Sequence, residues 1–141
     1  MKRYLIFAAV GPFLGGFLLL FATTYASGYW AQTNAAEVTK LFVVFGKTLQ
    51  FAYLFGVVPA LMMAAVDDIL LHIRRISWVV RLLIVGAIAF ATALLIYGGQ
   101  RTDSGALQFI LFGLPGLVPA TVSSWLAHKY AEPRPAPTAT A

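Results

Sequence analysis

Apolar residues dominate the chain in four long runs that contain no Asp, Glu, Lys or Arg. The runs cover residues 4–36, 48–66, 82–100 and 104–128. A helix needs about 20 apolar residues to cross the hydrocarbon core of a bilayer. The runs lack the polar alternation that is typical of barrel strands, the other structure that can span a membrane. The pattern therefore predicts an all-α polytopic membrane protein, a bundle of four transmembrane helices.

The charged zones between the runs set the boundaries of the elements. The expected spans cover about residues 4–25, 48–66, 79–97 and 106–127. They form one transmembrane domain over residues 1–130. Residues 38–45 place apolar side chains on one helical face, so this segment either extends the second span or lies flat on the membrane surface. Lys47 then lies at the membrane boundary and reaches outward, because a charge at mid-depth costs about 2.5–3.5 kcal/mol.

Composition excludes several classes of protein. The chain has 141 residues, of which 60% are hydrophobic and 11% are charged. Soluble domains average roughly 25% charged residues, and disordered chains need low hydrophobicity. Only residues 131–141, rich in Pro, Ala and Thr, are expected to form a disordered cytoplasmic tail. The absence of cysteine excludes disulfides, thiol catalysis and cysteine-ligated metal centres.

The basic residues predict the orientation of the spans. One side of the expected bundle carries seven of them: Lys2, Arg3, Arg74, Arg75, Arg81, Lys129 and Arg134. The other side carries three: Lys40, Lys47 and Arg101. The positive-inside rule places the richer side, with both termini, in the cytoplasm. The net charge of +5 therefore reflects topology, and no nucleic-acid partner is expected.

The connection between the second and third spans holds the densest group of polar side chains. Residues 67–78 are expected to form an amphipathic helix on the cytoplasmic surface, with Asp68, His72 and Arg75 on one face. Asp67, Asp68 and His72 are weak candidates for holding a divalent ion or for acid–base chemistry. The simpler interpretation is that the acidic side chains pair with arginine or histidine. We expect neither a cofactor nor an enzymatic activity.

Three arginines of this region suit anionic phosphate groups. Arg74, Arg75 and Arg81 are predicted to contact lipid headgroups or an anionic partner. A basic residue near an anionic leaflet contributes on the order of 1 kcal/mol to such binding.

Small residues indicate where the spans pack. The pairs Gly11 and Gly15, and Gly56 and Ala60, follow the small-xxx-small spacing that allows two helices to approach closely. The contact lies either within the bundle or between subunits, through self-association or with another membrane protein.

Two stretches carry a resemblance to a known family: residues 1–7 with residues 11–16, and residues 59–72. They resemble a family of small uncharacterised bacterial four-span inner-membrane proteins, classed as a domain of unknown function. The resemblance covers most of the chain except the tail. It implies a bacterial inner membrane, and it carries over no reaction, ligand or site residue.

These features predict a non-catalytic accessory or interaction protein of a membrane assembly or of the lipid bilayer. A second hypothesis is a small oligomeric transporter or flippase-like subunit. It requires a polar cavity that reaches mid-bilayer, and its candidate path is lined by Gln50, Gln108, Ser123 and Ser124. A third hypothesis is an interfacial enzyme, which requires Asp67, Asp68 and His72 to converge on a pocket.

Overall fold

The computed structural model describes residues 1–32, 34–73, 75–98 and 105–132, and these form helices and no strands. The elements in chain order are α1 (Lys2–Ala26), the 3-10 helix η1 (Tyr29–Gln32), α2 (Ala35–His72), α3 (Trp78–Ala93), the π-helical segment η2 (Leu94–Gly98) and α4 (Ala106–Tyr130). Four of the helices, counting α3 together with η2, are long and apolar enough to cross a membrane. The all-helical, four-span prediction is thereby confirmed.

The second span belongs to a helix much longer than a membrane is thick. The 38 residues of α2 extend about 57 Å, against roughly 30 Å for the hydrocarbon core. Asn34 caps its start by accepting a hydrogen bond from the backbone N–H of Glu37 (3.1 Å). Residues 38–45 therefore extend the second span as one continuous helix.

The amphipathic helix expected over residues 67–78 is not present as a separate element. Residues 67–72 are the last turns of α2, which ends at His72, and Ile73 has an extended backbone. Ser77 then begins α3 by accepting a hydrogen bond from the N–H of Val80 (3.3 Å). The chain must reverse its direction between α2 and α3, and α2 ends where this reversal begins. Arg75 consequently does not share a helical face with Asp68 and His72.

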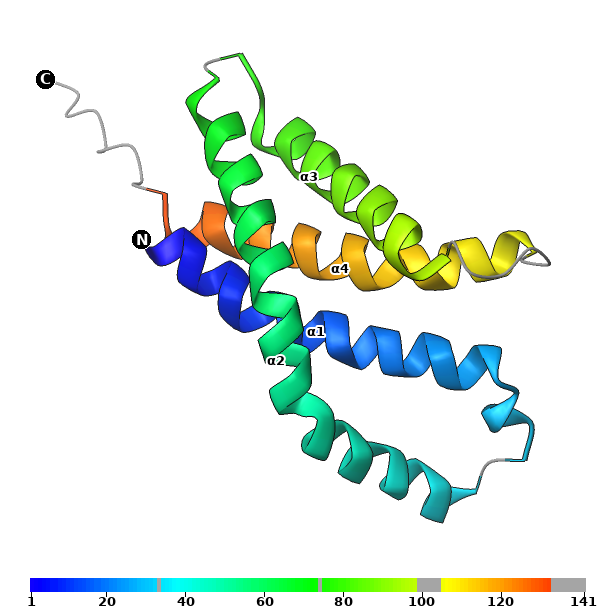
Figure 1. The fold of residues 1–141 in the computed structure, drawn as a ribbon. Helices are drawn as coiled ribbons and strands as arrows, with labels where there is room; N and C mark the ends of the chain where they lie inside the picture. The colour runs from blue at the N-terminus through cyan, green and yellow to red at the C-terminus, as the bar shows by residue number, and fades with distance from the viewer. Residues whose placement is uncertain (33, 74, 99–104, 133–141) are drawn as a thin grey trace, which may run out of the picture.

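Two helices form the centre of the bundle and two flank it. Figure 1 shows α1 and α4 side by side and running in opposite directions; α2 packs on α1, and α3 packs on α4. The flanking helices α2 and α3 contact each other much less. Arg3 contacts Asp67 and Glu132, and Glu132 also contacts Arg81, so the start of α1, the end of α2, the start of α3 and the end of α4 lie together. We call this part of the bundle the charged end.

The predicted small-residue positions lie at contacts between helices of this chain. A Cβ atom added to Gly11 of α1 would lie 2.8 Å from the Cβ of Ala60 in α2. One added to Gly56 would lie 3.0 Å from Pro12, and one added to Gly15 would face the backbone of α4 at 3.4 Å. These glycines therefore allow the helices to approach closely within the bundle.

Apart from Phe7, Leu41 and Phe45, the buried apolar side chains are small, and many large apolar side chains are exposed. Ala64, Val85 and Ala127 are fully buried, whereas Phe55 is 73% exposed and Leu95 is 82% exposed. Water would disfavour so many exposed apolar side chains, but lipid chains solvate them. The distribution supports a multi-pass membrane protein.

Candidate functional site

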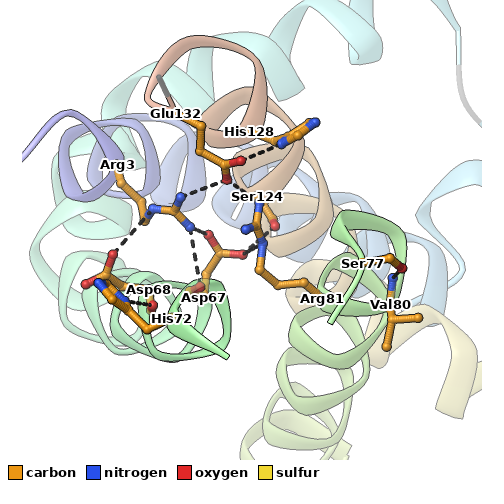
Figure 2. A network of polar contacts seen from close by, with 10 residues as sticks. All are labelled: Arg3, Asp67, Asp68, His72, Ser77, Val80, Arg81, Ser124, His128 and Glu132. Atoms are coloured by element: carbon orange, nitrogen blue, oxygen red, sulfur yellow. Dashed lines mark hydrogen bonds and ion pairs between the residues drawn. The ribbon is translucent and has the colours of Figure 1, made fainter. Parts of the chain in front are cut away.

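A buried network of charged side chains joins all four helices at the charged end (Figure 2). Arg3 lies at the start of α1, Asp67 near the end of α2, and Arg81 in the first turn of α3. Ser124 lies in α4, and Glu132 lies two residues beyond the end of that helix. Arg3, Asp67 and Arg81 are at most 5% exposed. We call these five residues the ion network.

Asp67 is the centre of the ion network. Its Oδ2 atom accepts a hydrogen bond from the guanidinium of Arg3, and its Oδ1 atom accepts one from the hydroxyl of Ser124 (2.5 Å). The Nε atom of Arg81 lies 3.3 Å from the same Oδ1 and forms an ion pair with it. One carboxylate of α2 thus connects to α1, α3 and α4.

Glu132 forms the second negative centre. Its Oε1 atom accepts a hydrogen bond from the Nη2 of Arg3 (2.9 Å) and pairs with the guanidinium of Arg81. Its Oε2 atom lies 2.7 Å from the Nδ1 of His128. Burial alone would raise the pKa of Glu132, but the hydrogen bonds with His128, Arg81 and Arg3 together lower it below its usual value.

His128 extends this end of the bundle toward α3. Its ring stacks on the indole of Trp78, with ring centres 5.1 Å apart and planes only 3° from parallel. It also lies one helical turn before Glu132, which places the imidazole beside that carboxylate. The first residue of α3 and the last turns of α4 are therefore joined by an aromatic contact next to the ion network.

The ion network is electrically balanced. Two guanidinium groups, of Arg3 and Arg81, face two carboxylates, of Asp67 and Glu132. A buried ion is unfavourable unless it is paired and hydrogen-bonded, and these four groups supply one another with partners. The hydroxyl of Ser124 donates to Asp67, so the arrangement fixes charges in place and ties the helix ends together.

The structure separates the residues proposed for metal binding or acid–base chemistry. Asp67 points into the bundle, while Asp68 lies at its edge, with Oδ1 3.7 Å from the Nε of Arg3. The Nδ1 of His72 lies 2.7 Å from the backbone carbonyl of Asp68. These side chains do not converge on a pocket. Among the residues that the structure describes, no three His, Cys, Asp or Glu side chains form a group that could hold a metal ion.

Two predictions about charged residues need correction. Arg81 was expected at the headgroup surface but is 3% exposed, because Asp67 and Glu132 hold its guanidinium inside the bundle. Glu132 was expected in a disordered tail but belongs to the ion network. Arg75 is exposed, as a headgroup contact requires. Arg74 and residues 133–141 lie outside the described residues.

Sequence reasoning missed Arg3, which it assigned to a water-facing basic terminus. The available signal was its position: Arg3, Asp67 and Arg81 each lie within a turn of an apolar run. The positive-inside rule predicts that these three positions lie on the same side of the membrane. A set of opposite charges at such positions is able to pair across helices.

An open groove of about 580 Å³ lies in the membrane-spanning part of the bundle, lined by residues of all four helices. Since α1 and α4 pack together while α2 and α3 contact each other much less, the central helices form its floor and the flanking helices its sides. Along α1 it extends from Phe7 to Thr23, about 24 Å at 1.5 Å per residue. Its length is therefore comparable to much of the hydrocarbon core.

The groove is apolar in character. Most of its lining is glycine, alanine, proline and large apolar side chains, and its polar side chains are Thr23, Thr48, Thr92 and Tyr97. Each of the three threonine hydroxyls donates a hydrogen bond to a carbonyl of its own helix, at 2.8–2.9 Å. Their polarity is therefore already satisfied within the protein.

The residues proposed for a polar path do not line this groove. Gln50 is exposed and Gln108 is half-buried, while Ser123 and Ser124 are buried near the charged end. Ser124 belongs to the ion network. The Ser123 hydroxyl has no hydrogen-bond partner within the part of the chain that the structure describes. The structure does not gather the four side chains around one cavity.

Comparisons with known proteins place the chain in a family. A search of curated proteins finds no match, and a search of solved structures finds none either. The model of one family matches residues 1–133, which is nearly the whole chain. This agrees with the resemblance to a family of unknown function. The chain belongs to the family of unknown function DUF5413.

Proposed function

We propose that this protein is a non-catalytic lipid-binding protein of the membrane, which holds an acyl chain of a bilayer lipid in the groove. The observation that carries the proposal is the apolar groove itself. Its volume of about 580 Å³ falls within the roughly 300–1,000 Å³ of ligand pockets in proteins. Its three threonine hydroxyls are already hydrogen-bonded to their own helices, so an apolar chain can cover them without loss of hydrogen bonds.

The dimensions of the groove also favour an acyl chain. Each leaflet contributes about 15 Å to a hydrocarbon core of about 30 Å. The lining along α1 covers about 24 Å, so the groove accommodates the whole length of a lipid tail. Phe51 and Phe55, which line the groove from α2, are both more than half exposed, so the groove opens toward the surrounding lipid.

The ion network supports this function by holding the bundle together beside the groove. The flanking helices α2 and α3 have little direct contact, and yet Asp67 and Arg81 pair across the charged end. This pairing fixes the two sides of the groove at one end. The rest of their length is free to accommodate a ligand.

The proposed location is a bacterial inner membrane, with the charged end in the cytoplasm. Lys2, Arg75 and Lys129 are exposed at or near this end, and Lys40 and Lys47 lie toward the opposite end of α2. This asymmetry is what the positive-inside rule requires. An accessory role for another membrane assembly is compatible with a groove that binds lipid.

Native mass spectrometry of the full chain, purified in a mild detergent, tests the proposal. We expect one phospholipid to remain bound to the wild-type protein. Thr92→Phe places an aromatic ring in the groove and should reduce the retained lipid at least severalfold. Ala91→Phe is the matched control, because Ala91 is the neighbouring residue of α3, is exposed and does not line the groove. It should leave lipid retention unchanged.

Two results would contradict lipid binding in the groove. One is equal lipid retention by the wild type and both variants. The other is a membrane protein that copurifies with the wild type and is lost in Thr92→Phe, since the groove would then hold a partner helix. Circular dichroism of both variants checks that helix content is preserved.

A further inference from the structure

Lys47 places a positive charge at the end of the groove that lies away from the ion network. It directly precedes Thr48 and lies four residues before Phe51, and both of these line the groove. Residues four apart in a helix share a face, so the Lys47 side chain starts one turn beyond Phe51, beside the end of the groove lining at Thr48. Thr23 of α1 and Tyr97 of η2 line the same end.

This lysine stands in apolar surroundings and is exposed. Residues 41–46 before it are apolar or glycine, and Leu49 and Phe51 follow it closely. A cation beside membrane-spanning apolar surface is unfavourable unless it reaches the headgroups or finds an anion. Ionisable residues in such positions are commonly part of a functional site.

The described part of the protein supplies no anion for Lys47. The acidic residue nearest to it in α2 is Glu37, whose Oε1 lies 2.7 Å from the ammonium of Lys40 and whose Oε2 accepts a hydrogen bond from Tyr29. The carboxylates of Asp67, Asp68 and Glu132 contact Arg3 or Arg81 at the charged end. Among the described residues, no salt bridge to Lys47 is formed.

We infer that the groove selects a phospholipid with a net negative headgroup, whose phosphate binds Lys47 and whose acyl chain lies along the groove toward Phe7. This inference rests on the proposed function and adds the class of lipid and its direction. The charge of Lys47 is complementary to the headgroup, and the apolar lining is complementary to the chain. The lipid belongs to the leaflet at the end opposite the charged end.

The test is a competition between two lipids with identical acyl chains. The full-length protein in detergent receives equal amounts of anionic phosphatidylglycerol and zwitterionic phosphatidylcholine, and native mass spectrometry measures the bound ratio. We expect the wild type to favour phosphatidylglycerol about fivefold, the effect of one basic residue on an anionic headgroup. Lys47→Gln should remove this preference and still retain lipid.

Lys40→Gln is the matched control. Lys40 lies in the same helix and is exposed, but its ammonium is paired with Glu37 and it lies eight residues before Thr48, where the groove lining of α2 begins. This variant should keep the wild-type preference. Soluble glycerol 3-phosphate should not displace the bound lipid, because it lacks the acyl chain.

The possible failures are distinguishable. No preference in the wild type, or an unchanged preference in Lys47→Gln, overturns the headgroup assignment. If Thr92→Phe still reduces total lipid in that case, lipid binding in the groove stands. If Thr92→Phe has no effect, the proposed function itself fails. Displacement by glycerol 3-phosphate overturns the inference in another way, since phosphate alone would then be the ligand.

Discussion

Arg3 and Asp67 form a buried ion pair that joins the first turn of α1 to the last turns of α2, across 64 residues of sequence. The side chain of Asp67 is completely buried, and that of Arg3 is only 6% exposed. Water therefore cannot replace either partner. The stability of the charged end depends on this carboxylate more than on any exposed acid beside it.

Asp67→Ala is expected to lower the free energy of unfolding by about 3–5 kcal/mol, because it leaves the buried guanidinium groups of Arg3 and Arg81 with one shared carboxylate, that of Glu132, in place of two. Asp68→Ala should cost less than about 1 kcal/mol, since the Asp68 side chain is 37% exposed and lies 3.7 Å from Arg3. Denaturation in detergent, followed by helical circular dichroism, compares the two. Equal losses would contradict the central role of Asp67.

Removal of the hydroxyl should destabilise the protein at Ser124 but not at Ser123, the neighbouring serine of α4. Ser124→Ala removes the hydrogen bond to Asp67 and should cost about 1–3 kcal/mol, because a buried charged acceptor loses a donor. The Ser123 hydroxyl is buried without a partner among the described residues, so Ser123→Ala should be neutral or stabilising. Unfolding midpoints of the two single variants check this prediction. A larger loss of stability in Ser123→Ala than in Ser124→Ala would contradict it.

Acid should weaken the protein through Glu132. The folded-state pKa of this carboxyl is lowered, so its contribution is present above the ordinary glutamate value of 4.5 and is lost as the pH falls through the lower folded-state pKa. The unfolding midpoint should therefore fall as the pH drops from about 5 to about 3. In Glu132→Gln the slope over this range should be smaller. An identical slope in the variant would show that other groups cause the loss.

Close packing of α3 against α4 depends on Gly116. A Cβ atom there would lie 2.1 Å from the carbonyl oxygen of Ala89, and backbone cannot move aside easily. Gly116→Ala should therefore destabilise the bundle by about 1–3 kcal/mol. Gly46→Ala is the control: nothing lies within 4 Å of the new atom, and helix propensity should stabilise by up to about 1 kcal/mol. Thermal unfolding in detergent separates the two outcomes.

The spans could be predicted from the sequence because charge is so unfavourable in lipid that its absence marks them. Helix α1 extends the expected span of residues 4–25 by two residues at the start and by one at the end. The sequence does not determine the length of α2, since residues 38–45 suit both a continuing helix and a surface helix. The structure shows the continuing helix.

The positions of Arg3, Asp67 and Arg81 beside apolar runs allow them to pair, but the individual contacts of the ion network could not be predicted, because they depend on how distant helix ends meet. Arg3 and Arg81 look identical in sequence to the basic residues that remain in water, such as Arg75. The difference lies in their partners: Asp67 and Glu132 come from other helices. The groove was equally hidden, because it results from the small contact between α2 and α3 and from no pattern within either helix.

The order in which the residues of the ion network are synthesised has a consequence for membrane insertion. Translation produces Arg3 first, and its partner Glu132 only 129 residues later, after α4 is complete. During insertion the first span must therefore keep its guanidinium at the membrane surface, where water and headgroups can solvate it. The network closes only when the fourth span has entered in the correct direction. A chain that stops short, or whose fourth span inserts inverted, retains uncompensated charge. Proteases and chaperones of the membrane can recognise such a chain by this charge.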